Sequence, residues 1–206
     1  MCRIFLILLF LISVFIIPEA FAKDITICAD NVIWNRKEEI TILTGNVLIT
    51  KGSMSISSTR MKVIGKLEAL NEVIGEEEVK IIDREKNILI SGGYVKYCKP
   101  TEYILITHRP KLELKKEDVV ITSMKMEGFY KEGKFIATNS VKITHKDTIV
   151  TASRAVYSED KKRLELTGNP QVIEGENKLT GRKMVYYLEE DRFEVIEGVK
   201  AILMRE

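Results

Sequence analysis

A short signature recurs six times along the chain, and this repetition limits the possible folds more than any other feature of the sequence. Each copy has an aliphatic residue, then Cys, Ser or Thr, then a small residue, at successive spacings of 29, 34, 31, 29 and 29 residues. The copies are Ile27-Cys28-Ala29, Ile56-Ser57-Ser58, Ile90-Ser91-Gly92, Ile121-Thr122-Ser123, Val150-Thr151-Ala152 and Leu179-Thr180-Gly181. A period of this length is typical of repeat proteins, in which each unit contacts mainly its neighbours. We therefore expect six stacked units of about 30 residues.

Apolar and polar residues alternate with a period of two between the signatures. Leu164/Leu166 and Phe193/Val195 are clear examples, each pair separated by one glutamate. Short polar clusters, such as residues 131–134 and 158–163, interrupt these runs and are typical of hairpin turns. Period-two alternation predicts strands with one buried face. The sequence thus predicts an all-β domain from about residue 25 to the C-terminus, without helices.

The alternation shifts by one position just after the small residue of each signature. In the fifth unit the apolar residues are Val150 and Ala152, and then Ala155 and Tyr157. Such a shift would turn the strand inside out unless a bulge or a bend absorbed it. Bends at six equivalent places would fold the strands around a corner and give an elongated, curled double sheet. A single hairpin unit is only marginally stable, so stability must come from stacking.

The N-terminus has the three parts of a secretory signal peptide. Arg3 precedes an apolar run over residues 4–17, and Ala20-Phe21-Ala22 follows as a cleavage site. The run is short compared with the roughly 20 apolar residues of a membrane-spanning helix. We expect a signal peptide at residues 1–22 and a mature domain at residues 23–206, exported from the cytoplasm. An uncleaved membrane anchor is the alternative.

Residues for catalysis or metal binding are scarce. The two histidines, His108 and His145, are not at metal-ligand spacing with Cys, Asp or Glu, and no known catalytic motif is present. The domain after residue 22 has 31 basic and 29 acidic residues, which is not the charge pattern of a nucleic-acid-binding protein. We expect no enzymatic activity, no metal and no cofactor.

Two cysteines, Cys28 and Cys98, remain after cleavage of the predicted signal peptide. An exported protein can join two cysteines in a disulfide. The two residues occupy different positions of their repeat units, so the pattern does not imply partnership. A single bridge and two free thiols both stay open.

Two segments of the chain resemble a known family. These are Ala29-Asp30-Asn31-Val32 and Thr44-Gly45-Asn46-Val47-Leu48-Ile49, which recur 123 residues later in Ala152-Ser153-Arg154-Ala155 and Thr167-Gly168-Asn169. With these motifs the chain resembles the LptA/OstA family of periplasmic lipopolysaccharide (LPS) transport proteins over nearly all of its mature length. The second and third units depart from the pattern, because residues 76–78 and His108-Arg109-Pro110 replace the Gly-Asn turn.

The resemblance implies a half-open β-jelly roll, also called a β-taco, that holds lipid acyl chains along its interior. It also implies a periplasmic protein that bridges the inner and outer membranes. Members of the family join end to end, or to LptC-like and LptD-like proteins, by pairing their terminal strands.

The resemblance implies that the inward positions given by the alternation line a lipid-binding groove. Its residues are Ile27, Val32, Trp34, Ile42, Val47, Ile49, Ile56, Met61, Val79, Ile81, Ile90, Leu112, Ile121, Met126, Val141, Ile143, Val150, Met184 and Val199. The uncapped ends of the stack predict edges for strand pairing and head-to-tail self-association. These edge residues are Ile25, Thr26, Ile27, Val199, Lys200, Ala201 and Ile202.

Two other functions fit the same pattern. The first is an LptC-like export component that keeps its N-terminal segment as a membrane anchor. The second is a structural β-solenoid whose inward residues, including Met61, Met126 and Met184, form a dry core.

Overall fold

The computed structural model describes residues 25–203, except for 67, 68, 86, 117, 159, 162, 188, 189 and 191. The predicted signal peptide lies outside the described residues. The described chain is almost entirely β-structure, and the predicted all-β class is confirmed. A short 3-10 turn at Tyr130–Glu132 is the one departure from the expectation of no helix in this part of the chain. No helix among the described residues is long and apolar enough to span a membrane.

The strands are of two kinds. Six of the strands have 11 to 15 residues: β3 (Ile40–Lys51), β4 (Met54–Lys66), β5 (Ala69–Asp83), β6 (Ile88–Cys98), β11 (Lys134–His145) and β12 (Thr148–Ser158). The others have three to five residues: β1 (Ile25–Cys28), β2 (Asn31–Asn35), β7 (Tyr103–Thr107), β8 (Lys111–Leu114), β9 (Val119–Thr122), β10 (Lys125–Phe129), β13 (Arg163–Thr167), β14 (Gln171–Glu174), β15 (Asn177–Thr180), β16 (Lys183–Tyr187), β17 (Arg192–Ile196) and β18 (Lys200–Ile202).

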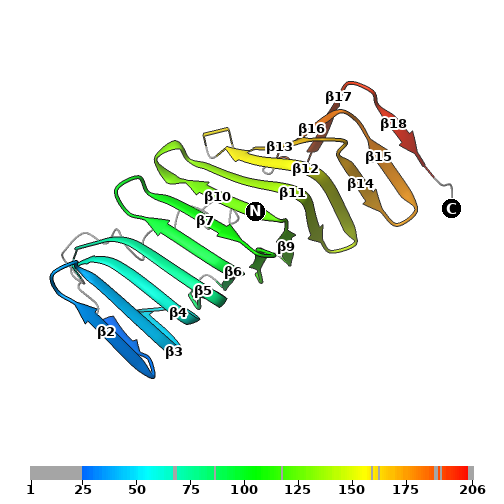
Figure 1. The fold of residues 1–206 in the computed structure, drawn as a ribbon. Helices are drawn as coiled ribbons and strands as arrows, with labels where there is room; N and C mark the ends of the chain where they lie inside the picture. Colours follow the sequence, from blue (N-terminus) through cyan, green and yellow to red (C-terminus); the bar gives the residue numbers. More distant parts are fainter. Residues whose placement is uncertain are drawn as a thin grey trace.

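All 18 strands of the described residues belong to one antiparallel sheet that folds along its length into two layers. The first layer has the order β1-β3-β4-β5-β6-β8-β9-β11-β12-β14-β15-β18. The second has the order β2-β3-β4-β5-β6-β7-β10-β11-β12-β13-β16-β17. The long strands bend and run through both layers. Figure 1 shows the resulting elongated molecule, with β2 and β3 at one end and β17 and β18 at the other.

The bend between the layers is built by pairs of residues with positive φ. The pairs are Gly45-Asn46, Glu77-Glu78, His108-Arg109, Asn139-Ser140, Gly168-Asn169 and Glu197-Gly198. In β3, β5 and β11 the register shifts at these pairs, and in β12 burial moves from Val150 and Ala152 to Ala155 and Tyr157. The predicted one-residue shift is therefore confirmed, whereas the division into six repeats stays an interpretation of the sequence.

Backbone hydrogen bonds fix these corners. The amides of Asp30, Gly93 and Arg182 donate to the carbonyls of Gly45, His108 and Glu197 at 2.9, 3.0 and 2.9 Å. Glu77-Glu78 and His108-Arg109 adopt the same left-handed backbone as Gly45-Asn46. The units that lack the Gly-Asn turn therefore still form the corner. Left-handed conformations are uncommon for residues other than glycine, and the surrounding hydrogen bonds hold them in place.

The inner faces of the layers carry continuous rows of cross-strand partners. In the second layer, the row nearest the corner is Val32, Leu43, Met61, Gly75, Val95, Ile106, Met126, Ala137, Ala155, Leu166, Met184 and Val195. Met61, Met126 and Met184 in this row are fully buried. In the first layer, the aliphatic row is Ile27, Ile49, Ile56, Ile81, Ile90, Leu112, Ile121, Ile143, Val150, Val172, Leu179 and Ala201. The core lies between these rows.

Candidate functional site: an apolar groove with a polar rim

A cavity of about 650 Å³ lies between the two layers in the C-terminal part of the molecule. The first layer contributes the aliphatic wall Ile121, Ile143, Val150, Val172 and Leu179. The second layer contributes Phe135, Tyr157, Leu164, Tyr186 and Phe193. These walls form because successive inward residues of antiparallel strands stand side by side. The result is an apolar cavity between the layers.

The wall from the second layer is rich in aromatic rings. Phe135, Tyr157, Leu164, Tyr186 and Phe193 are successive cross-strand partners in one row. The rings of Tyr186 and Phe193 stack with centroids 4.2 Å apart and planes 9° from parallel. Trp34 begins the same row at the other end of the molecule, and Tyr97 lies within it.

The sequence predicted only Trp34 of this row as a groove residue. The sequence does contain a pattern that could have indicated the other aromatic residues of the row, because Tyr97, Tyr157 and Tyr186 recur at the same position of the repeat.

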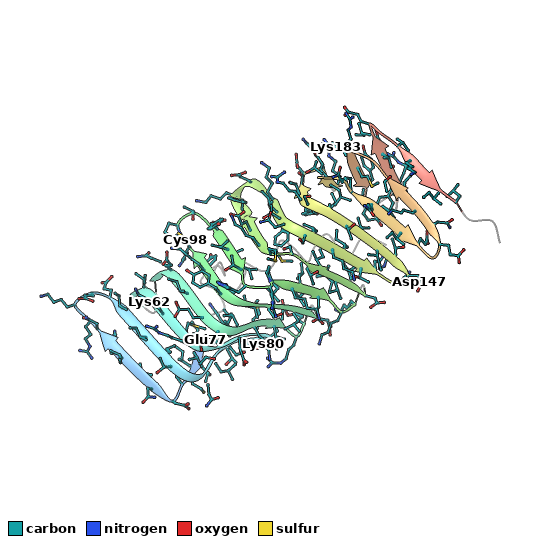
Figure 2. The ribbon with its side chains drawn as sticks, turned by 45° about the vertical axis from the view of Figure 1, so that its right-hand side comes forward. Lys62, Glu77, Lys80, Cys98, Asp147 and Lys183 are labelled. Carbon is teal, nitrogen blue, oxygen red and sulfur yellow. The ribbon has the colours of Figure 1, made fainter. Side chains whose placement is uncertain are left out.

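The rim of the cavity is polar where the first layer ends. His145, Lys146, Asp147 and Thr148 come from the β11–β12 hairpin, and Glu174, Asn177 and Lys178 come from the β14–β15 hairpin. Figure 2 shows Asp147 at the tip of its hairpin. Apolar walls below a polar rim suit an amphiphile, whose tails and head group need opposite surroundings.

Most of the predicted groove residues lie on inner faces. Ile121, Ile143 and Val150 line the cavity itself. Ile27, Ile49, Ile56, Ile81, Ile90 and Leu112 continue the same first-layer row. Val32, Met61, Met126 and Met184 belong to the second-layer row, and Val47, Val79 and Val141 are buried beside the corners. Whether these residues touch lipid stays a prediction.

Two predicted groove residues are placed differently. Ile42 faces outward with its cross-strand partners Ile33 and Lys62, whereas its neighbours Thr41 and Leu43 are buried. The prediction for Ile42 was wrong because residues 40–43 carry apolar side chains on both faces of β3. Val199 follows the last corner and is 60% exposed, so it does not lie in the core.

Within the described residues, the cysteines and histidines form no combined site. Cys28 and Cys98 are both free thiols, so the disulfide that the sequence left open is not present. His108 Nδ1 lies 3.1 Å from Thr107 Oγ1 at a corner, and His145 lies at the cavity rim. No group of three metal-ligating side chains occurs among the described residues.

Ion pairs cover the outer faces. Lys96 Nζ lies 2.7 Å from Glu72 Oε2, and Lys183 Nζ lies 2.9 Å from Glu165 Oε2. The Lys183 ammonium, together with the Arg163 guanidinium, lowers the pKa of the Glu165 carboxyl. Exposed pairs of this kind add little stability, and they place charge on the outer face of the strands that carry them.

The chain matches a known protein family over most of its length. The family model described as "LptA/(LptD N-terminal domain) LPS transport protein" matches residues 26–192. The chain belongs to this family. The resemblance found in the sequence is therefore confirmed, and the chain is a component of LPS transport.

Curated sequences and solved structures give weaker support for the family assignment than the family model does. No curated protein sequence matches the chain. The solved structures that match include LptH, described as the LptA homologous periplasmic component of the conserved lipopolysaccharide transport device from Pseudomonas aeruginosa. The likeness has 8% identity and a TM-score of 0.29, and it covers 89% of this chain and 96% of that chain. The family assignment therefore depends on the family model.

Proposed function

We propose that this protein carries LPS by holding the acyl chains in the groove between its two layers. The observation that supports this most strongly is the apolar cavity of about 650 Å³ with a polar rim. Ligand pockets typically have volumes of about 300–1,000 Å³, and each acyl methylene moved out of water contributes about 0.8 kcal/mol. A dry structural core would leave no room for such chains.

A pair of neighbouring residues in β14 provides the test. Val172 lines the cavity, whereas Ile173 lies on the other face of the strand with its partners Ile149 and Lys178. A photo-crosslinking amino acid at position 172 should capture purified LPS, and the same amino acid at position 173 should not. Capture at both positions, or at neither, would contradict lipid binding inside the groove.

We further propose that the protein works in the periplasm after cleavage behind Ala22. The support is the family assignment together with the signal-like pattern of residues 1–22. The LptC-like alternative predicts that this segment is retained as an anchor. N-terminal sequencing of the protein recovered from cells distinguishes the two, since a mature chain that begins at Lys23 excludes the anchor.

Both ends of the double sheet present apolar edge strands. At one end, β2 carries Ile33 and Trp34, which are 65% and 58% exposed. At the other, Val199 and Leu203 flank β18 and are 60% and 75% exposed. Unpaired strand edges with apolar side chains are sites for strand addition. We propose head-to-tail self-association through these edges, and pairing with LptC-like and LptD-like partners that together bridge the two membranes.

We propose one register for this contact. Neighbouring strands in each layer are antiparallel, so β2 of a second copy continues the second layer antiparallel to β17. The inner rows run on without interruption when Trp34 of the second copy faces Phe193, and Val32 faces Val195. In the first layer, Ile27 then faces Ala201. The two contacting edges differ, so the contact is heterologous, and we propose that it extends into an open filament.

Sedimentation velocity over a range of concentrations tests the assembly. The intact chain should form oligomers that lengthen with concentration, and a chain that lacks residues 199–206 should remain a folded monomer. A single monomeric species for the intact chain at high concentration would contradict self-association.

A further inference from the structure

The middle residue of the repeated signature points away from the groove. It is Cys28 in the first copy and Ser or Thr in the other five. Because the aliphatic residue before it faces inward, this residue lies on the outer face of the first layer. From β6 to β15 the hydroxyl-bearing members are Ser91, Thr122, Thr151 and Thr180, and they belong to one row of cross-strand partners. The lipid groove uses none of them.

Lysines alternate with these hydroxyls in the same row. Every second strand from β5 to β18 carries a lysine, except that β14 carries Gln171. The lysines are Lys80, Lys111, Lys142 and Lys200. Neighbouring strands lie about 4.8 Å apart, so the backbones of Lys80, Lys111 and Lys142 follow one another at about 10 Å. We call the row from Lys80 to Lys200 the lysine ladder.

Ion pairs are distributed unequally between the two outer faces. The outer face of the second layer is crossed by pairs between neighbouring strands. On the outer face of the first layer, the described side chains form one pair, in which Lys111 Nζ lies 2.7 Å from Glu113 Oε1. Within the described part of the chain, Lys80, Lys142 and Lys200 have no carboxylate partner. A row of cations without carboxylate partners attracts a ligand with several negative charges.

An aliphatic row runs beside the lysine ladder, two residues further along each strand. Its apolar members are half-buried and face outward: Ile82, Leu89, Val120, Ile149 and Ile173. Two residues of a strand span about 7 Å, so one extended ligand can contact both rows. The apolar faces of sugar rings can pack against such a row, while the charged groups of the same polymer meet the lysines.

The shape and charge of this face favour a polymer over other anionic or apolar partners. Neighbouring strands of a sheet are rotated by roughly 20–25°, so a row that crosses many strands is not planar. A flexible polymer can follow such a row, whereas a flat bilayer cannot contact all of it. A second copy of this chain, seated on the same face, would bring lysines against lysines.

We propose that the lysine ladder binds a linear acidic polysaccharide that runs along the long axis of the molecule. The lysines contact anionic groups on alternate sugars, and the hydroxyls of Ser91, Thr122 and Thr151 form hydrogen bonds with sugar hydroxyls. The Thr180 hydroxyl donates to the Lys200 carbonyl at 3.3 Å and is not used in this way. The site lies on the opposite face of the first layer from the groove and does not rest on lipid binding.

Labelled hyaluronan oligosaccharides test the ladder, because alternate sugars of hyaluronan carry a carboxylate. Neutral chitin oligosaccharides of the same length are the comparison. Fluorescence anisotropy should show binding of hyaluronan to the intact protein at about 0.05 M NaCl, and an affinity more than about tenfold lower at 0.5 M. The chitin oligosaccharides should bind much more weakly at low salt. Equal affinity for the two polymers, or binding of neither, would overturn the proposal.

Matched double variants assign the binding to the ladder. Lys80→Gln with Lys142→Gln should lower the affinity for hyaluronan about three- to tenfold, because exposed charge contacts are individually weak. Lys62→Gln with Arg154→Gln removes the same charge from the outer face of the second layer and should change the affinity by less than about twofold. Figure 2 shows that Lys80 and Lys62 lie on different layers. Equal losses in two folded double variants would overturn the proposal.

A gain of affinity gives an independent test. Glu113→Gln releases Lys111 from its ion pair and removes a negative charge beside the ladder, so it should raise the affinity for hyaluronan about twofold. A variant that only disturbs the fold would not bind more tightly. A lower affinity in folded Glu113→Gln would overturn the proposal.

Two further measurements separate the polymer from other ligands. Saturating the groove with a fatty acid should leave hyaluronan binding unchanged, and competition between the two would overturn the assignment to the outer face. Co-sedimentation with phosphatidylglycerol vesicles tests a bilayer as the partner. Vesicle binding that Lys80→Gln with Lys142→Gln weakens, in a protein that does not bind hyaluronan, would overturn the proposal and assign this face to a membrane.

Discussion

Replacing Ile143 with aspartate should weaken lipid binding strongly. Ile143 lies between Ile121 and Val150 in the aliphatic row, and all three line the cavity. A carboxylate in this wall draws in water and removes dry contact from about two to three methylenes of an acyl chain. At about 0.8 kcal/mol for each methylene, the loss is about 1.6–2.4 kcal/mol, which corresponds to a Kd about 15- to 60-fold higher.

Thr144→Asp is the matched control, because Thr144 is the next residue of β11 and faces outward with Val120 and Ile149. The charge change is the same, and we expect an effect of about twofold or less. Displacement of a fluorescent fatty acid measures both affinities, and circular dichroism with thermal unfolding checks that both variants fold. Equal losses of affinity in two folded variants would refute the assignment of the groove to the inner face.

Three further predictions concern the corners, the core and the edges. Gly168→Ala should destabilise the protein by about 1–3 kcal/mol in urea unfolding, because its φ is +80° and an added Cβ would lie 2.3 Å from the Ser153 side chain. The control Gly175→Ala, with φ +56° and open space around the added Cβ, should cost about 1 kcal/mol or less. Equal costs for the two variants would contradict the corner geometry. Burial raises the pKa of Tyr97 from 10.0 to about 12. The stability that the neutral Tyr97 hydroxyl contributes is therefore complete below pH 10 and is lost as the pH rises through about 12. The Tyr97→Phe variant should lose less stability than the intact protein over this interval, and an identical loss would contradict the burial of Tyr97. Cysteines at Ile33 and Glu194, in a mature chain with Cys28 and Cys98 replaced by serine, should link different molecules. Bonds within single molecules would contradict the head-to-tail register.

Much of the fold could be predicted because a one-residue shift in the alternation has a direct geometric meaning. The signature residues Ile56, Ile90, Ile121 and Val150 all lie in the first-layer row. The corners formed by Glu77-Glu78 and His108-Arg109 were harder to foresee. Glu77, Glu78 and Arg109 are of residue types that do not favour positive φ, and the conformation is imposed by the strands on either side.

The site could be predicted only in part. Alternation gives the face of a strand, but it fails where both faces are apolar, as at Ile42 in β3. The position of the cavity depends on how far the two layers stand apart around Tyr157 and Phe193, and no local pattern encodes that distance. The polar rim brings together hairpins at residues 145–148 and 174–178, which only the strand pairing makes adjacent.

Lipid analysis of the natively purified protein tests the central claim most directly. The protein is isolated from its own cells without detergent, extracted with organic solvent, and its lipids are identified by mass spectrometry. A variant with Ile143→Asp, prepared in the same way, provides the control for the groove. The account predicts LPS or a closely similar glycolipid, in amounts approaching one molecule per chain and strongly reduced in the variant. A folded native protein that yields no glycolipid, or equal amounts from both proteins, would contradict it.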